Sequence, residues 1–213
     1  MIIMESVEKK VAQKLLEIEA VQLNIEKPFE WVSGWKSPIY CDNRKILSVP
    51  QVRGFIRNAM CQSILHNYPS VEVIAGVATG AIAMGALIAD KLNKPFVYVR
   101  PRRKEHGTGA QIEGSFPAKA NVVVVEDLIS TGHSALSAVD CLKMSYANVL
   151  GVSAIFSYNF DIARRAFEKS NCELYTLTNY ETLIEEAASK KFISPEQIET
   201  LKVWRLTPNT WGQ

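Results

Sequence analysis

The sequence has few residues of the two types that bind zinc or form disulfides. Only four cysteines and three histidines occur among its 213 residues. The cysteines show neither C-x-x-C spacing nor histidine partners at zinc-site spacing, so the sequence predicts no structural metal centre. Scattered cysteines of this kind are typical of reduced thiols in a cytoplasmic protein. They are Cys41, Cys61, Cys141 and Cys172.

Strong net charge and a long N-terminal apolar run are also missing. The 24 basic and 22 acidic residues leave a net charge of +2, which argues against a nucleic acid or a membrane as partner. The first ten residues include acids and lysines, so we expect neither a signal peptide nor a membrane span. With 47% hydrophobic residues, the chain can bury a substantial core of one ordinary domain.

The N-terminal quarter predicts two helices around a hairpin. Apolar residues at helical spacing indicate a helix over about 5–20. Aromatic and β-branched residues then alternate around Ser33 and Gly34, which predicts a turn between short strands. Ser48 and Gln51 form a capping-box pattern for the second helix.

Strands and helices alternate through the rest of the chain. This alternation predicts an α/β fold, in which a parallel twisted sheet is flanked by helices on both faces. The N-terminal helix and hairpin would form a small cap over the carboxyl edge of the sheet, where open α/β sheets bind ligands. Strands are expected near 71–78, 96–100, 122–126, 149–157 and 174–177, with two further helices after 181.

Residues 122–134, VVVVEDLISTGHS, join a buried-strand pattern to an acidic pair and a hydroxyl-rich loop. The loop would lie at the carboxyl end of the strand, where backbone N–H groups, hydroxyls and a helix N-terminus can bind a phosphate. Glu126 and Asp127 would repel that phosphate but can accept hydrogen bonds from vicinal sugar hydroxyls. The segment therefore suits a ribose 5-phosphate. The structural alternative is a Ser-Thr-Gly turn that caps the following helix.

A long basic connection precedes this segment. Residues 100–114, RPRRKEHGTGAQIEG, combine cations with three glycines. Loops of this length are often lids, and this one could deliver positive charge to an anion. A solvated basic loop is the alternative for such a run of charge. The basic residues are Arg100, Arg102, Arg103, Lys104 and His106.

Residues 122–134 resemble the phosphoribosyl pyrophosphate (PRPP) signature of type I phosphoribosyltransferases, with His133 where that signature usually has a small residue. RRKEHGTGAQIEG at 102–114 resembles the catalytic loop of the orotate phosphoribosyltransferases. SGWKSPIYCDNRK at 33–45 is similar to their N-terminal signature, and GVATGAIAMGA at 76–86 stands where a pyrophosphate loop is expected. The spacing of these blocks agrees with the family, so the resemblance covers most of the chain.

The resemblance implies a fold, a reaction and partners. It implies one domain over 1–213, with a cap at 1–47, a PRPP-binding core at 48–180 and C-terminal helices at 181–213. The implied reaction converts orotate and PRPP into orotidine 5′-monophosphate and pyrophosphate in pyrimidine synthesis. Mg²⁺ would be held mainly through PRPP and pyrophosphate, with no metal site formed by protein residues. A homodimer that shares the 100–114 loop between subunits is also implied.

The resemblance also implies roles for individual residues. The catalytic group is Arg100, Lys104, His106 and Asp127. PRPP would contact Arg100, Lys104, His106, Glu126, Asp127, Leu128, Ile129, Ser130, Thr131, Gly132, His133 and Ser134. Ser130 would also reach the orotate.

Four positions depart from one branch of the family. Gly80, Pro101 and Val32 stand where that branch has basic residues, and Phe160 stands where it has the arginine that binds the orotate carboxylate. We therefore expect Arg44, in the cap signature, to bind that carboxylate. Two alternatives remain open at this point: a purine phosphoribosyltransferase, or a PRPP-binding regulator of the same fold that binds RNA or DNA.

Overall fold

A six-stranded sheet forms the centre of the molecule. The computed structural model describes residues 6–31, 34–102 and 111–211. Within these residues the strand order is β10-β9-β8-β5-β6-β7, and all neighbours are parallel except β6 and β7. The strands are β5 (Val73–Val77), β6 (Phe96–Val99), β7 (Ile112–Glu113), β8 (Asn121–Ile129), β9 (Asn148–Ser157) and β10 (Leu174–Asn179).

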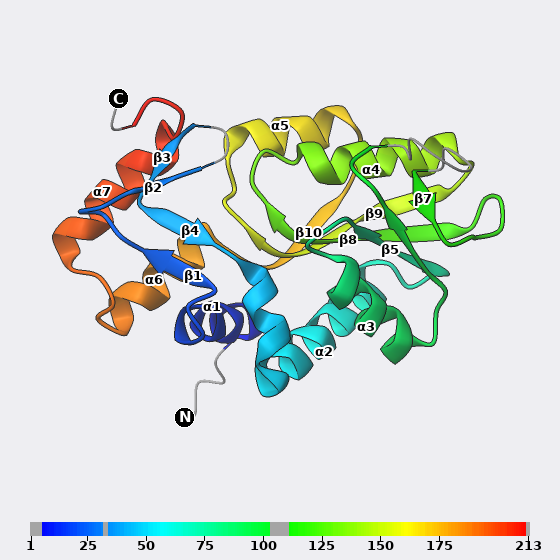
Figure 1. The fold of residues 1–213 in the computed structure, drawn as a ribbon, viewed down its shortest axis with the longest axis horizontal. Coiled ribbons are helices and arrows are strands. Elements are labelled where there is room, and N and C mark those ends of the chain that lie inside the picture. The colour runs from blue at the N-terminus through cyan, green and yellow to red at the C-terminus, as the bar shows by residue number, and fades with distance from the viewer. Residues whose placement is uncertain (1–5, 32–33, 103–110, 212–213) are drawn as a thin grey trace.

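Helices cover both faces of this sheet (Figure 1). On one face lie α1 (Val7–Glu17), α2 (Pro50–Asn67) and α3 (Ile82–Leu92); on the other lie α4 (His133–Met144) and α5 (Asp161–Lys169). The valines of β8 explain this arrangement, because successive side chains of a strand point to opposite faces. Val123 and Val125 pack in the core below α2 and α3, whereas Val122 and Val124 pack with α4. The predicted α/β fold is confirmed.

The cap consists of two short antiparallel ladders and a 3₁₀ helix. Strand β1 (Val21–Leu23) pairs with β4 (Ile39–Cys41), and β2 (Phe29–Glu30) pairs with β3 (Lys36–Ser37). The 3₁₀ helix η1 (Asn43–Ser48) then leads into α2. Figure 1 shows that the cap lies beside the C-terminal helices, α6 (Tyr180–Ser189) and α7 (Pro195–Leu206).

Aromatic side chains attach the cap to the C-terminal helices and to the end of β9. Their ring centroids lie 5.1–6.4 Å apart, and the Nε1 of Trp204 donates a hydrogen bond to the Lys36 carbonyl at 3.2 Å. Aromatic pairs at such distances contribute about 0.5–1.5 kcal/mol each beyond their buried area. We call this set the aromatic cluster: Trp31, Trp35, Tyr158, Phe160 and Trp204.

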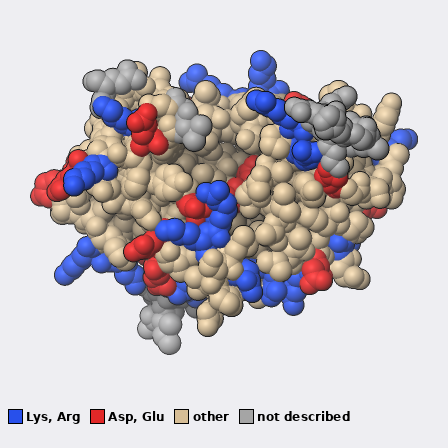
Figure 2. All heavy atoms as spheres, viewed as in Figure 1, with Lys and Arg blue, Asp and Glu red and all other residues tan. Residues whose placement is uncertain are grey.

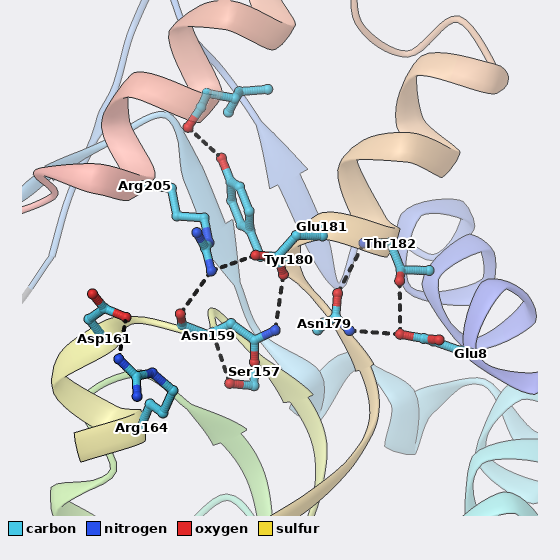
Figure 3. A network of polar contacts seen from close by, with 11 residues as sticks. Glu8, Ser157, Asn159, Asp161, Arg164, Asn179, Tyr180, Glu181, Thr182 and Arg205 are labelled. Carbon is cyan, nitrogen blue, oxygen red and sulfur yellow. Dashed lines mark hydrogen bonds and ion pairs between the residues drawn. The ribbon is translucent and has the colours of Figure 1, made fainter. Parts of the chain in front are cut away.

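Polar contacts reinforce this attachment (Figure 3). The Nη2 of Arg205 in α7 donates to the Asn159 carbonyl at 2.9 Å and pairs with Glu181 Oε1 at 2.5 Å. The Nδ2 of Asn179 donates to Glu8 Oε1 at 2.7 Å and joins the end of β10 to α1. The C-terminal helices are therefore anchored next to Phe160, at the end of β9.

Several predicted boundaries are wrong. The capping box at Ser48 does not form, because Ser48 ends η1 and α2 begins at Pro50 with no side-chain cap. Pro50 is suited to the first helical position, where its missing N–H costs nothing. Strand β8 continues three residues beyond the predicted end at Glu126, and β7 lies inside the predicted 100–114 loop.

Candidate active site

The candidate site lies where β5 and β8 run side by side. The chain passes from β5 to β6 on one side, whereas β8 and β9 lie on the other, so the strand order reverses between β5 and β8. Ligands of open α/β sheets bind at the carboxyl ends of the strands at such a point. Gly80, just after β5, closely approaches Asp127, near the end of β8: a Cβ added to Gly80 would lie 2.5 Å from Asp127 Oδ2.

The two acids of β8 have different environments. Glu126 is only 5% exposed, and its Oε1 accepts a hydrogen bond from the Asp127 N–H at 3.0 Å. Burial, together with the neighbouring Asp127 carboxyl, raises the pKa of Glu126 well above its ordinary value. Asp127 is half-buried, so its carboxylate can reach a ligand. The pair thus combines an accessible acid with a buried one that favours its protonated form.

The loop between β8 and α4 has free helical N–H groups at its end. Gly132 is the N-cap of α4, so the Ser-Thr-Gly turn does precede the helix, but glycine has no side chain to bond the first N–H groups. The N–H groups of the first turn have no partner within a helix and can bind an anion. Gly132 has a φ of +81°, which residues with a side chain rarely adopt, and a Cβ there would lie 2.9 Å from the Phe167 ring.

This loop is shorter than predicted. Leu128 and Ile129 belong to β8, because the ladder to β9 continues to the pair Ile129 and Ser157. Ile129 as a whole is 1% exposed and its carbonyl accepts a hydrogen bond from the Tyr158 N–H at 3.0 Å, so this residue belongs to the core. Ser130 and Thr131 are half-buried, while His133 and Ser134 are exposed in the first turn of α4.

The start of η1 brings the cap to Asp127. Asn43 is buried, and its Nδ2 donates to the Asp127 carbonyl at 2.5 Å. The neighbouring Arg44 side chain is 61% exposed, and its Nε donates to Asp42 Oδ1 at 2.6 Å. This hydrogen bond lowers the pKa of Asp42. Within the described residues the two Nη groups of Arg44 have no hydrogen-bond partner, so the end of the guanidinium is available to an anion.

Phe160 is not at the position of a ligand-binding side chain. It is 3% exposed and stacks on Tyr158, with ring centroids 5.3 Å apart, inside the aromatic cluster. The residue that replaces the arginine of the other family branch therefore packs the cap against α7. A cation for a carboxylate would have to come from elsewhere, and Arg44 is an exposed one in the same 3₁₀ helix as Asn43.

The base of the predicted catalytic loop is a closed hairpin stem. The Arg100 N–H donates to the Gln111 carbonyl at 2.9 Å, and Gln111 Nε2 donates to the Arg100 carbonyl at 3.0 Å. The Arg100 guanidinium lies 3.7 Å from Glu113. Arg100 also lines a cavity of about 100 Å³ with His133 and Ser134, between the end of β6 and α4. Lys104 and His106 lie outside the described residues.

On the face drawn in Figure 2, the basic and acidic side chains of the described residues are interspersed. In the described part of the chain, no group of three or more metal-binding side chains gathers, and no helix combines the length and apolarity needed to span a bilayer.

Comparison with known proteins shows the family to which the chain belongs. The model of the phosphoribosyl transferase domain matches residues 45–187. A protein of Porphyromonas gingivalis named orotate phosphoribosyltransferase is 48% identical over 209 residues, which are 98% of this chain and all of that protein. The chain belongs to the orotate phosphoribosyltransferase family. A Listeria innocua member is 50% identical over 98% of this chain and its own full length.

A solved family member has the same fold. The orotate phosphoribosyltransferase of Aeropyrum pernix superposes with a TM-score of 0.75 at 27% identity, covering 84% of this chain and 98% of that one. The recognition of the family from residues 33–45, 102–114 and 122–134 is therefore confirmed.

Sequence reasoning missed two residues that surround Asp127. Asn43 lies inside the N-terminal signature, but a neutral amide in a polar segment also suits a turn. Gly80 lies in the 76–86 segment expected to be a pyrophosphate loop, but nothing in that segment predicts its approach to Asp127. Contacts between segments far apart in sequence explain both, and no local pattern reveals such contacts.

Proposed function

We infer that this chain is an orotate phosphoribosyltransferase, which transfers the ribose 5-phosphate of PRPP to orotate and releases pyrophosphate, in pyrimidine biosynthesis. The observation that carries this inference is the half-buried Asp127 at the point where the strand order reverses between β5 and β8, with its backbone carbonyl bound to the cap by Asn43. Family membership over nearly the whole chain supports orotate rather than a purine as the acceptor.

The reacting ribose becomes cationic as the bond from C1 to pyrophosphate breaks. Asp127 would accept hydrogen bonds from the ribose hydroxyls, and its negative charge would stabilise the cationic ring. Glu126 would help to hold Asp127 in place, because its Oε1 accepts a hydrogen bond from the Asp127 N–H. The 5-phosphate would bind the N–H groups and hydroxyls of residues 130–134, so that remote binding energy positions the reacting carbon.

The leaving pyrophosphate needs positive charge. We propose that Lys104 and His106, with Arg100 at the base of the loop, supply that charge. The contact of Arg100 with Glu113, at 3.7 Å, lies in the hairpin stem, so Arg100 would be held at the edge of the site. Ser130 and Arg44 would bind the orotate, Arg44 through a fork of two N–H groups to its carboxylate.

We further propose that Mg²⁺ accompanies PRPP. Asp127 is half-buried and Glu126 is buried, and these two acids are too few to coordinate Mg²⁺ by themselves. The site therefore fits an ion that is coordinated mainly by substrate oxygens. When bound, the ion would neutralise charge on the pyrophosphate. A homodimer that shares the 100–114 loop, and a cytoplasmic location, remain proposals from the family resemblance.

Release of pyrophosphate by the purified protein tests the function. Orotate should support release, whereas adenine, hypoxanthine and uracil should not. Uracil differs from orotate by the carboxylate alone, so it also tests for a cation that selects that group. Release with a purine but not with orotate would disprove the assignment. Binding of PRPP without release by any of the four bases would favour the regulator.

A further inference from the structure

Asn43 is a buried amide that connects the cap to the sheet. It is 4% exposed, and its Nδ2 lies 2.5 Å from the carbonyl oxygen of Asp127, which is 84 residues away in sequence. The Cys41 thiol donates to its Oδ1 across 3.4 Å. A buried amide left without partners would cost free energy, so both contacts matter to the folded chain.

The two contacts also determine which way the amide points. Cys41 is buried, and this burial, with the nearby Asp127 charge, raises the pKa of the thiol, which therefore keeps its proton and donates. A flipped amide would place its oxygen against the Asp127 carbonyl oxygen, two acceptors with no proton between them. Oδ1 therefore faces Cys41, and Nδ2 faces β8.

The hydrogen bond from Asn43 to Asp127 lies between the proposed binding sites for orotate and for PRPP. On one side, Asp42 holds Arg44, the candidate ligand of the orotate carboxylate. On the other side is Asp127, the candidate ligand of the ribose hydroxyls. We propose that Asn43 is a positioning residue, which sets the cap against β8 and so aligns orotate with the reacting carbon of PRPP. This proposal rests on the proposed function.

An alignment role predicts a loss in turnover rather than in binding. Asn43→Leu keeps a similar branched shape but removes both hydrogen bonds, so the cap can shift over β8. A misplacement of about 1 Å can cost ~100-fold in rate. We expect kcat to fall by ~10- to 100-fold, while the KM values for orotate and for PRPP each stay within about threefold.

Asn67→Leu is the matched control. Asn67 in α2 also donates through Nδ2 to a backbone carbonyl, that of Ser63 at 2.9 Å, but within its own helix. Its replacement should lower the melting temperature without changing kcat per folded molecule. A merely structural role of Asn43 would give this same pattern. Asn43→Ser, which is smaller and keeps a hydroxyl, provides the test if the leucine variant does not fold.

The possible outcomes distinguish a failure of this proposal from a failure of the proposed transferase activity. An inactive wild type would disprove the function itself. With an active wild type, a selective loss of kcat in the Asn43 variant supports positioning. A kcat per folded molecule within twofold of the wild type, or a rise in KM alone, would overturn it. Failure of both variants to fold would make Asn43 a structural residue and would overturn it as well.

Discussion

Replacing Gly80 by alanine should impair catalysis with little effect on folding. The added Cβ would lie 2.5 Å from Asp127 Oδ2 and 2.6 Å from its Cγ. Carbon atoms in favourable contact lie about 3.5–4.0 Å from their neighbours, so the carboxylate would have to move by about 1 Å. Asp127 has little freedom to do so as a whole, because Asn43 binds its carbonyl and Glu126 accepts from its N–H.

The carboxylate would therefore rotate away from its present position. A catalytic group misplaced by about 1 Å costs ~100-fold in rate, or about 2.7 kcal/mol of transition-state stabilisation. Gly80 lacks the positive φ that alanine tolerates poorly. Alanine at a compatible position stabilises the folded state by about 0.4–1 kcal/mol, which offsets part of the steric strain. We expect kcat/KM for PRPP to fall ~100-fold while the free energy of unfolding changes by less than ~1 kcal/mol.

Gly54→Ala provides the control for this experiment. Gly54 lies in α2, and a Cβ there would meet nothing within 4 Å. This variant should gain up to about 1 kcal/mol of stability from helix propensity and keep its full activity. Steady-state kinetics with varied PRPP and thermal melting of both variants decide the question. If Gly80→Ala keeps kcat/KM for PRPP within twofold of the wild type, catalysis does not depend on the present position of the Asp127 carboxylate.

Three further predictions concern charge. Lys104→Ala should lower kcat by about two orders of magnitude, or ~3 kcal/mol, because its charge matters most as pyrophosphate leaves; an unchanged kcat would exclude it from the mechanism. Arg44→Lys should raise KM for orotate much more than for PRPP, and an equal rise in both would contradict carboxylate binding. Because the pKa of Glu126 is raised, the stability it contributes is present below the ordinary glutamate pKa and lost as pH rises. Glu126→Gln should therefore melt above the wild type at about pH 8 and lose that advantage near pH 4, and an advantage independent of pH would refute this sign.

The central sheet could be predicted because its strands carry their own signal. The valines of β8 are apolar on both faces, as a strand covered by helices requires. Its end could not be predicted, since Glu126 and Asp127 resemble the residues that end strands. The ladder to β9 continues beyond them because Leu128 and Ile129 find partners in Phe156 and Ser157. Tertiary pairing thus overrides the local preference.

The candidate site could be predicted only where one continuous segment supplies it. Residues 126–134 provide the acids, the glycine N-cap and the first turn of α4 within one stretch of chain. The cap side of the site depends on contacts between distant segments. Neither the bond from Asn43 to Asp127 nor the fit of Gly80 against that carboxyl has a local pattern, because each needs the cap or β5 to be folded against β8.

The attachment of the cap relates the burial of Phe160 to the position of Arg44. Phe160 follows β9 and packs against Trp35 and Trp204, so its ring helps to hold the cap on α7. A charged side chain buried at this position would lose the ring contacts and would need a partner within the cluster. A cap attached in this way places its 3₁₀ helix over Asp127, and with it the exposed fork of Arg44. Phe160 in place of the other branch's arginine, and Arg44 as the proposed ligand of the orotate carboxylate, would then both follow from this packing of the cap.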